Sequence, residues 1–204
     1  NWIAPVGPHL NSFEKKLSEI SDGKEIAALS SGTSAIHLAL ILLGVECGDE
    51  VLCSSFTFSA SANPIIYQGA KPVFIDSELD TWNICPKYLE EAIINRLENN
   101  IKPKAIIVVH LYGMPAKMTE IIAISKKYDI PIIEDAAEGL GSTYFGKPLG
   151  CLAEFGIYSF NGNKIITTSG GGALISSDKE KIQKSKFLAT QARDDAPHYE
   201  HSHI

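Results

Sequence analysis

The chain has 204 residues, a net charge of −6 at pH 7, and 45% hydrophobic against 21% charged residues. This acidic balance excludes the basic face of a general nucleic-acid-binding protein, and no apolar run reaches the roughly 18 residues of a membrane span. We therefore predict a globular chain with neither a nucleic acid nor a membrane as partner.

Strands and helices alternate along most of the chain. In chain order the predicted elements are strand 25–31, helix 34–45, strand 50–56, helix 59–70, strand 71–77, helix 85–98, strand 103–113, helix 118–129, strand 130–139, strand 154–160, strand 171–176 and helix 179–192. Several strands are apolar throughout, which is typical of a mainly parallel sheet that is covered by helices on both faces. The predicted fold class is therefore α/β, and in such sheets ligands bind outside the carboxyl ends of the strands.

No linker, repeat or low-complexity segment divides the chain, so residues 1–204 are predicted to form one domain. The chain starts at Asn1 rather than Met and ends in "HYEHSHI" without a helix stop or strand end, so we expect truncation at both ends. The four cysteines, at positions 47, 53, 85 and 151, have no CxxC spacing and are predicted to be buried free thiols of a cytoplasmic protein.

The first predicted strand ends in Ser30-Ser31-Gly32-Thr33-Ser34 and leads directly into a helix. Gly32 lets a ligand approach the backbone, while Thr33 and Ser34 offer hydroxyls at a helix N-terminus, whose positive partial charge favours phosphate. An ordinary N-cap is the alternative interpretation. The run is neither a P-loop nor a GxGxxG fingerprint.

Two further strand ends carry groups that a flat, charged ligand could use. Phe56 and Phe58 lie at the end of the second strand and either cap the core or provide an aromatic face for a ring. Asp135 follows Glu134 at the end of an apolar strand, where it either caps a turn or pairs with a buried cation.

The stretch "SFNGNKIITTSGGG", residues 159–172, places a lysine between a strand and a glycine cluster. Ser159 ends the strand, and Lys164 follows five residues later. Taken alone, such a lysine is a surface charge. In a partly desolvated pocket a lysine is a nucleophile that forms Schiff bases with carbonyl compounds.

These four strand ends together match the needs of one cofactor. Pyridoxal phosphate requires a phosphate clamp, a stacking face, a partner for its protonated ring nitrogen and a lysine for its aldehyde. The aspartate keeps the ring nitrogen protonated, which allows the ring to accept electrons. The pattern predicts pyridoxal 5'-phosphate as the cofactor.

At these residues the sequence resembles the fold type I pyridoxal-phosphate enzymes and, within them, the DegT-type sugar aminotransferases. The similar stretches are "WIAPVGP", "SSGTSAIHLAL", "GDEVLCSSFTFSASANPI", "AKPVFID", "VVHLYG", "IIEDAAEGLGS", "GIYSFNGNKIITTSGGGALI" and "TQARDD". The sequence looks closest to the transaminases of the UDP-N-acetylbacillosamine pathway, which carry similar "NGNKIITTSGGG" and "QAR…HYEH" stretches. The resemblance implies a three-layer sandwich like the large domain of aspartate aminotransferase, with a small C-terminal domain beyond residue 204.

The resemblance also implies residue roles. Lys164 would bind the cofactor through a Schiff base and move the proton during transfer, Asp135 would pair with the ring nitrogen, and Phe58 would stack on the ring. Glu138 takes the position near the ring hydroxyl at which the broader family usually has Gln or His. The residues implied to hold the phosphate are Gly32, Thr33, Ser159 and, as an addition, Ser34.

The implied reaction moves an amino group from L-glutamate to C4 of a UDP-4-keto-6-deoxy-N-acetylhexosamine, in a homodimer whose active site is shared between subunits. Lys164 favours transfer, because dehydratase relatives have histidine at this position. Two alternatives are a catalytically incomplete or regulatory protein of the same fold and a nucleotide-binding dehydrogenase. The dehydrogenase is disfavoured by the missing GxGxxG fingerprint.

Other polar residues are predicted to be structural. His110 is interpreted as a satisfied core histidine, and the terminal histidines at 198, 201 and 203 are not expected to form a metal site with Glu200. Arg193 contacts either a nucleotide phosphate, an acid across the dimer, or an acid in a surface salt bridge.

Overall fold

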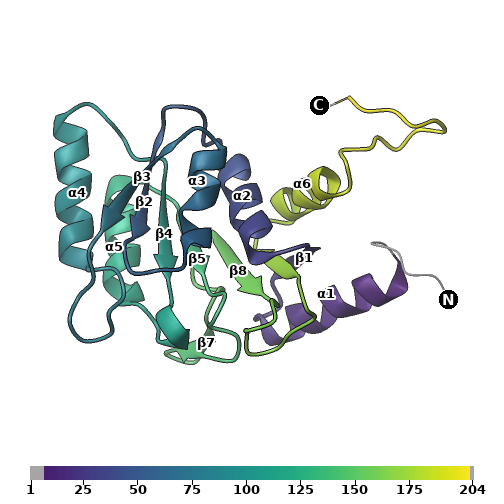
Figure 1. Ribbon diagram of the computed structural model, residues 1–204, viewed down its shortest axis with the longest axis horizontal. Coiled ribbons are helices and arrows are strands. Elements are labelled where there is room, and N and C mark those ends of the chain that lie inside the picture. The colour runs from purple at the N-terminus through teal and green to yellow at the C-terminus, as the bar shows by residue number, and fades with distance from the viewer. Residues whose placement is uncertain (1–6, 203–204) are drawn as a thin grey trace.

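A seven-stranded sheet forms the centre of the computed structural model, which describes residues 7–202 (Figure 1). The strand order is β1-β9-β8-β5-β4-β2-β3, in which β3, β2, β4, β5 and β8 are parallel and β9 runs against both of its neighbours. The strands are β1 (Glu25–Leu29), β2 (Glu50–Ser54), β3 (Lys71–Ile75), β4 (Ala105–Val109), β5 (Ile132–Asp135), β8 (Phe155–Ser159) and β9 (Gly172–Ser176). The predicted mainly parallel sheet is confirmed.

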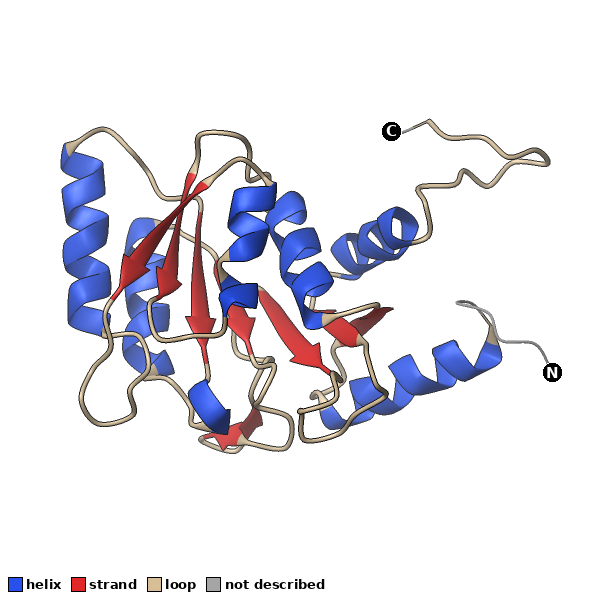
Figure 2. Ribbon diagram, in the orientation of Figure 1, coloured by secondary structure: helices blue, strands red, loops and turns tan. Residues whose placement is uncertain are grey.

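Helices cover both faces of this sheet and complete three layers (Figure 2). One face packs against α2 (Gly32–Leu42), α3 (Asn63–Tyr67) and α6 (Lys179–Ala189). The other face packs against α4 (Pro86–Glu98) and α5 (Met118–Tyr128), and, toward β1, against α1 (Pro8–Ile20). Each large apolar side chain buried between the layers contributes on the order of 1.5–3 kcal/mol.

Local sequence signals set where the helices begin. The Ser31 hydroxyl accepts a hydrogen bond from the Ser34 N–H at 3.0 Å, and Asp178 caps α6 through the N–H groups of Glu180 and Lys181. Proline occupies the first turn of α1 and α4, where its missing N–H costs nothing. Because α2 begins directly after β1, its N-terminus lies at the carboxyl end of the sheet.

Several predicted boundaries are wrong. The segment predicted as helix 59–70 consists of the 3-10 turn η1 (Ser59–Ser61) and the short helix α3, because Pro64 cannot donate within a continuing helix. The strand predicted over 130–139 ends at Asp135, and the strand predicted over 103–113 ends at Val109, before the 3-10 turn η2 (Leu111–Gly113). Helix α1 and the hairpin of β6 (Thr143–Tyr144) and β7 (Lys147–Pro148) were not predicted.

The cysteines are free, as predicted, but their predicted burial is only partly right. Cys53 and Cys151 are buried, Cys85 is intermediate, and Cys47 is exposed because it lies in the turn between α2 and β2. Burial and the nearby Asp135 carboxylate raise the pKa of the Cys53 thiol to about 12, so this thiol stays neutral. Among the described residues, no helix is both long and apolar enough to cross a membrane.

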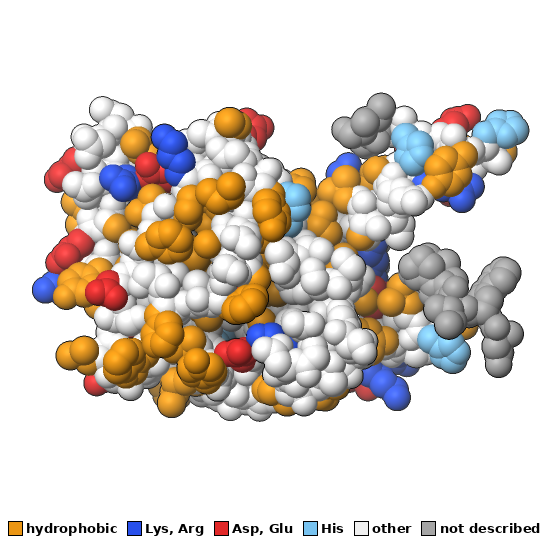
Figure 3. Space-filling model, viewed as in Figure 1, with side chains coloured by type: hydrophobic (Ala, Val, Ile, Leu, Met, Phe, Trp, Pro, Cys, Tyr) orange, Lys and Arg blue, Asp and Glu red, His pale blue; other side chains and the backbone are white. Residues whose placement is uncertain are grey.

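Loops at the carboxyl ends of the strands expose aromatic side chains. Phe56, Phe58, Trp82 and Tyr112 are all exposed, and the rings of Phe56 and Trp82 meet edge to face at 6.0 Å. Figure 3 shows hydrophobic side chains gathered in the lower part of the view, where these loops lie in Figure 1. The C-terminal segment after α6 extends away from the sheet on another side of the molecule (Figure 1).

Candidate functional site

A cavity of about 300 Å³ lies at the carboxyl ends of β1, β2, β5 and β8. Seven of the eight predicted site residues line this cavity: Gly32, Thr33, Phe58, Asp135, Glu138, Ser159 and Lys164. Ser34 does not line the cavity, because its hydroxyl is bonded to the Ser31 hydroxyl at 2.8 Å within the helix cap. Because the carboxyl ends of parallel strands meet at one edge of the sheet, segments that are more than 100 residues apart in sequence meet at this cavity.

The N-terminus of α2 faces the end of β8 at close range. A Cβ atom added at Gly32 would lie 3.1 Å from the Ser159 Cβ, so glycine is what allows the two segments to approach. The first N–H groups of a helix have no partner within the helix and carry a positive partial charge. This end of the cavity, with the hydroxyls of Thr33 and Ser159, can hold a phosphate group.

Lys164 lies in the cavity wall and is largely withdrawn from solvent, with 12% of its side chain exposed. Its Nζ is 3.2 Å from Oε1 of Glu138. The other carboxylate oxygen of Glu138 accepts the backbone N–H of Tyr112 at 3.0 Å. A lysine that is held by one partner and is open to a cavity on its other side can act on a ligand there.

Asp135 closes the cavity from the end of β5. Its carboxylate accepts the Ser61 hydroxyl at 2.6 Å and the Ala137 N–H at 3.2 Å. Burial raises the pKa of this carboxyl above its usual range, although the two hydrogen bonds and the charge of Lys164 act against the rise. A cationic group in the cavity would stabilise the ionised carboxylate.

Glu134, one residue earlier, points to the opposite face of the sheet, where it forms a closed network. Its carboxylate accepts N–H groups from Gly150, Leu152 and Ala153 and the ring N–H of His110. The other ring nitrogen of His110 accepts the Ala116 N–H at 3.2 Å, which assigns the ring proton to Nε2. The prediction that His110 is a satisfied core histidine is confirmed.

Some cavity residues were not assigned by sequence reasoning. Asn161 and Asn163 line the cavity beside Lys164, and their place next to the lysine in the glycine-flanked stretch was the available signal. Ser61 and Tyr112 reach the site through turns whose direction depends on tertiary packing. No local pattern identifies them.

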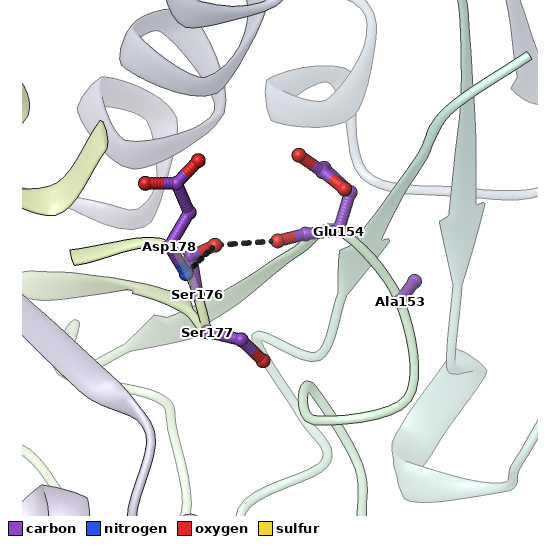
Figure 4. Close-up of a pocket in the computed structure, with 5 residues that line it drawn as sticks. All are labelled: Ala153, Glu154, Ser176, Ser177 and Asp178. Carbon is purple, nitrogen blue, oxygen red and sulfur yellow. Dashed lines mark hydrogen bonds between the residues drawn. The ribbon is translucent and has the colours of Figure 1, made fainter. Parts of the chain in front are cut away.

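A second hollow lies at the opposite end of the sheet, between the start of β8 and the end of β9 (Figure 4). Its polar groups satisfy one another, because Ser176 donates to the Glu154 carbonyl at 2.8 Å and accepts the Asp178 N–H at 3.1 Å. Among residues 7–202, no group of three or more His, Cys, Asp or Glu side chains could hold a metal ion. This hollow is therefore not a candidate site.

The C-terminal candidates lie away from the cavity. The Arg193 guanidinium stacks on the ring of Tyr199 at 4.9 Å, and His201 contacts the Ala192 carbonyl. His203 lies outside the described residues, as does most of the "WIAPVGP" stretch. Neither Arg193 nor His201 lines the cavity at the carboxyl ends of the strands.

A mainly parallel three-layer sandwich with a lysine largely withdrawn from solvent, a strand-end aspartate and a helix N-terminus around one cavity defines the class of fold type I cofactor enzymes. The chain belongs to the DegT/DnrJ/EryC1/StrS aminotransferase family, whose profile matches residues 1–204. The family prediction made from the sequence motifs is confirmed.

Three curated relatives place the chain within this family. It is 59% identical to the pyridoxal phosphate-dependent aminotransferase EpsN of Bacillus subtilis, over 100% of this chain and 53% of that protein. It is 42% identical to the UDP-4-amino-4,6-dideoxy-N-acetyl-beta-L-altrosamine transaminase of Campylobacter jejuni, over 91% of this chain and 48% of that protein. It is 42% identical to the GDP-perosamine synthase of Escherichia coli O157:H7, over 87% of this chain and 47% of that protein.

Solved structures agree with the fold. A DegT DnrJ EryC1 StrS aminotransferase from Brucella abortus superimposes with a TM-score of 0.92 at 33% identity, covering 98% of this chain and 54% of that one. The PLP form of a sugar aminotransferase from Streptococcus pneumoniae gives 0.88 at 30% identity, covering 97% of this chain and 54% of that one. The predicted fold class is confirmed, and the chain spans about half the length of the relatives it matches.

Proposed function

We propose that this chain is the cofactor-binding part of a pyridoxal-phosphate-dependent aminotransferase that acts on a nucleotide-linked keto sugar. The observation that carries the proposal is that Lys164 and Asp135 line the same cavity. Only 12% of the lysine side chain is exposed, and burial raises the pKa of the aspartate. A buried carboxyl with a shifted pKa that lines a cavity together with a second ionisable side chain is a candidate for a functional site.

The residues present fit pyridoxal phosphate at each of its polar ends. Asp135 is a buried carboxylate with two donors and room for a third partner, which suits a protonated ring nitrogen. Gly32, Thr33 and Ser159 line the end of the cavity that can accept a phosphate. Phe58 projects from the loop after β2 with 76% exposure, which leaves its ring free to cover a flat ligand.

When bound, the cofactor supplies an aldehyde that receives the amino group and a ring that withdraws electrons. Lys164 would hold the cofactor through that aldehyde, and its Nζ, once free, would serve as the acid and base that moves a proton. Asp135 would keep the ring nitrogen protonated. Glu138 holds the lysine amine at the mouth of the cavity.

We further propose L-glutamate as the donor and a UDP-4-keto-6-deoxy-N-acetylhexosamine as the acceptor. The support is the resemblance to bacillosamine-pathway enzymes, together with a relative named for a UDP-4-amino-sugar. Another relative is named for a GDP-sugar, so the nucleotide must be varied in any test. Because nucleotide-linked sugars are made in the cytoplasm, we propose that the protein acts there.

The proposal includes a homodimer with a shared active site and a small C-terminal domain that follows this large domain. The exposed aromatic residues around the cavity support it, since aromatic side chains are enriched where protein surfaces meet. A second subunit placed over these loops would exclude water from Lys164.

The test is amino transfer by the complete protein. It is incubated with pyridoxal phosphate, L-glutamate and a panel of UDP- and GDP-linked 4-keto-6-deoxy sugars, and both products are measured by mass spectrometry. We expect 2-oxoglutarate and one amino sugar in equal amounts, and neither product from Lys164→Ala. Cofactor binding without transfer to any sugar of the panel would contradict the proposal and favour the regulatory alternative.

A further inference from the structure

The turn after β4 has an unusual backbone and a direct link to the lysine. Tyr112 in η2 adopts left-handed angles (φ 51°, ψ 27°), and the following Gly113 has φ 81°. A non-glycine residue in this region is uncommon and is held there by its surroundings. The conformation directs the Tyr112 N–H to Glu138 Oε2 at 3.0 Å.

The same turn is wedged against the segment that carries Glu138. A Cβ atom at Gly113 would lie 2.8 Å from the Glu138 carbonyl oxygen, so the close approach requires glycine as well as a positive φ. The distance between the turn and Glu138 is therefore fixed at two points, the carbonyl and the carboxylate.

Buried side chains hold the turn from behind. Asn83, which is 2% exposed, accepts the Leu111 N–H at 2.9 Å and donates to the Met114 carbonyl at 3.0 Å, so it brackets both ends of the turn. His110 is anchored on Glu134 at 3.1 Å. A buried amide that satisfies two backbone groups of a strained turn supplies the surroundings that such a turn needs.

We propose that this turn is a positioning device that holds the Glu138 carboxylate beside Lys164, and that Asn83 acts on the lysine through it. The inference rests on the proposed function. It assigns a role to the loop after β3, which carries Asn83, and to the turn after β4, neither of which touches the lysine directly.

The expected consequence concerns the charge on the lysine nitrogen. A carboxylate 3.2 Å away stabilises a positive charge on that nitrogen, both free and once the cofactor aldehyde is attached to it. The other titratable groups near this pair are Asp135, from the same segment, and His110 beyond it, whose ring N–H is donated to Glu134. Glu138 is thus the carboxylate whose removal changes the charge beside Lys164 while leaving the ring-nitrogen partner in place.

The experiment is a pH titration of the absorbance of the complete, cofactor-loaded protein. The protonated lysine–cofactor link absorbs near ~420 nm and the neutral link near ~360 nm. We expect Glu138→Gln, which keeps the shape and loses the charge, to lower the pH midpoint by about one unit, since a partly exposed pair is screened. Asn83→Ala should lower it in the same direction by a few tenths of a unit.

The double variant tests whether Asn83 acts through Glu138. We expect Asn83→Ala to cause no further shift in the Glu138→Gln background, because the charge that it positions is then absent. An equal shift in both backgrounds would overturn the role of Asn83. If Asn83→Ala does not fold, Asn83→Ser, which keeps a hydroxyl at this position, carries the same comparison.

Two surface variants serve as matched controls. Glu91→Gln and Asn95→Ala remove a carboxylate and an amide from the exposed side of α4, and neither should move the midpoint. An unchanged midpoint in Glu138→Gln, with the band intact, overturns this inference alone. A wild-type protein without any band that borohydride bleaches overturns the proposed function as well.

Discussion

The two carboxylates that end β5 are neighbours in sequence but differ in almost every physical respect. Glu134 is fully buried on the α5 side of the sheet and accepts four N–H donors, at 2.6–3.1 Å. Asp135 is 6% exposed on the α3 side and accepts two donors, with its remaining capacity directed into the cavity. A buried acid with every lone pair satisfied stabilises the fold, whereas one with spare capacity is available for a ligand.

This contrast bears on the pKa of the Asp135 carboxyl. The donors around Glu134 replace the water that the carboxylate loses on burial. Asp135 has fewer donors, and burial therefore raises the pKa of its carboxyl. Successive side chains of a strand point to opposite faces of the sheet, so Glu134 lies in the packed interior while Asp135 faces the cavity.

The largest expected effect is on amino transfer and comes from a variant of Lys164, which lines the cavity with Asp135. Under the proposed function, Lys164→Ala removes the nitrogen that would hold the cofactor and move the proton, so amino transfer should fall by at least ~10³-fold. Steady-state kinetics with saturating cofactor measure this loss. Lys126→Ala, on the exposed side of α5, is the matched control and should retain wild-type rates.

The next largest effect is on stability and comes from a variant of Glu134. Glu134→Ala leaves three backbone N–H groups and the His110 ring N–H buried without their acceptor, so the free energy of unfolding should fall by about 3–5 kcal/mol. Chemical denaturation followed by circular dichroism measures the change. A loss below about 1 kcal/mol would contradict the network assigned to this residue.

Asp135→Asn is expected to change stability in the opposite direction. The pKa of the Asp135 carboxyl is higher in the folded protein than in the unfolded chain, so ionising it costs folding free energy as the pH rises. The asparagine removes this cost, so the cofactor-free variant should unfold a few degrees above wild type at pH 7. Under the proposed function, cofactor affinity should fall at least ~10-fold, because the ring nitrogen would lose its charged partner.

The pH dependence sharpens that prediction. At low pH the wild-type carboxyl is protonated and the two proteins should melt together. The gap should open as the pH rises above the usual range of an aspartate and become constant once the folded-state carboxyl is ionised. Thermal melts of both proteins across this range measure the gap, and a wild-type protein that remains the more stable one at neutral pH would refute the account.

The smallest effect concerns the aromatic cover of the cavity. Phe58 is 76% exposed, so Phe58→Ala should leave the free energy of unfolding within about 0.5 kcal/mol of wild type. Cofactor affinity should fall about 3–10-fold through the lost stacking. Phe145→Ala, at an 88% exposed position in the β6–β7 turn, should change neither quantity, and an equal loss of affinity in both variants would contradict the stacking role.

The reactive side of the comparison was largely predictable from sequence. Parallel strands end at one edge of the sheet, so the sequence alone could place Gly32, Asp135, Ser159 and Lys164 together. Ser34 was wrongly predicted to line the site, because the sequence does not show whether a hydroxyl at a helix start faces a ligand or caps its own helix.

The supporting side was not predictable. Glu134 was recognised as an acid at a strand end, but its donors come from residues 150–153, whose loop path depends on packing around Gly150 and Gly156. Asn83 and Tyr112 meet through tertiary contacts between two loops. Helix α1 escaped prediction, and it packs on the sheet through a narrow stripe that includes Phe13 and Leu17.

The most direct test of the account is the identity of the lysine that reacts. The complete protein is incubated with pyridoxal phosphate, reduced with borohydride, digested and analysed by peptide mass spectrometry. We predict one reduced adduct, on the peptide that carries Lys164, together with loss of the band near ~420 nm. An adduct confined to other lysines, or a protein that gains no adduct at all, would contradict it.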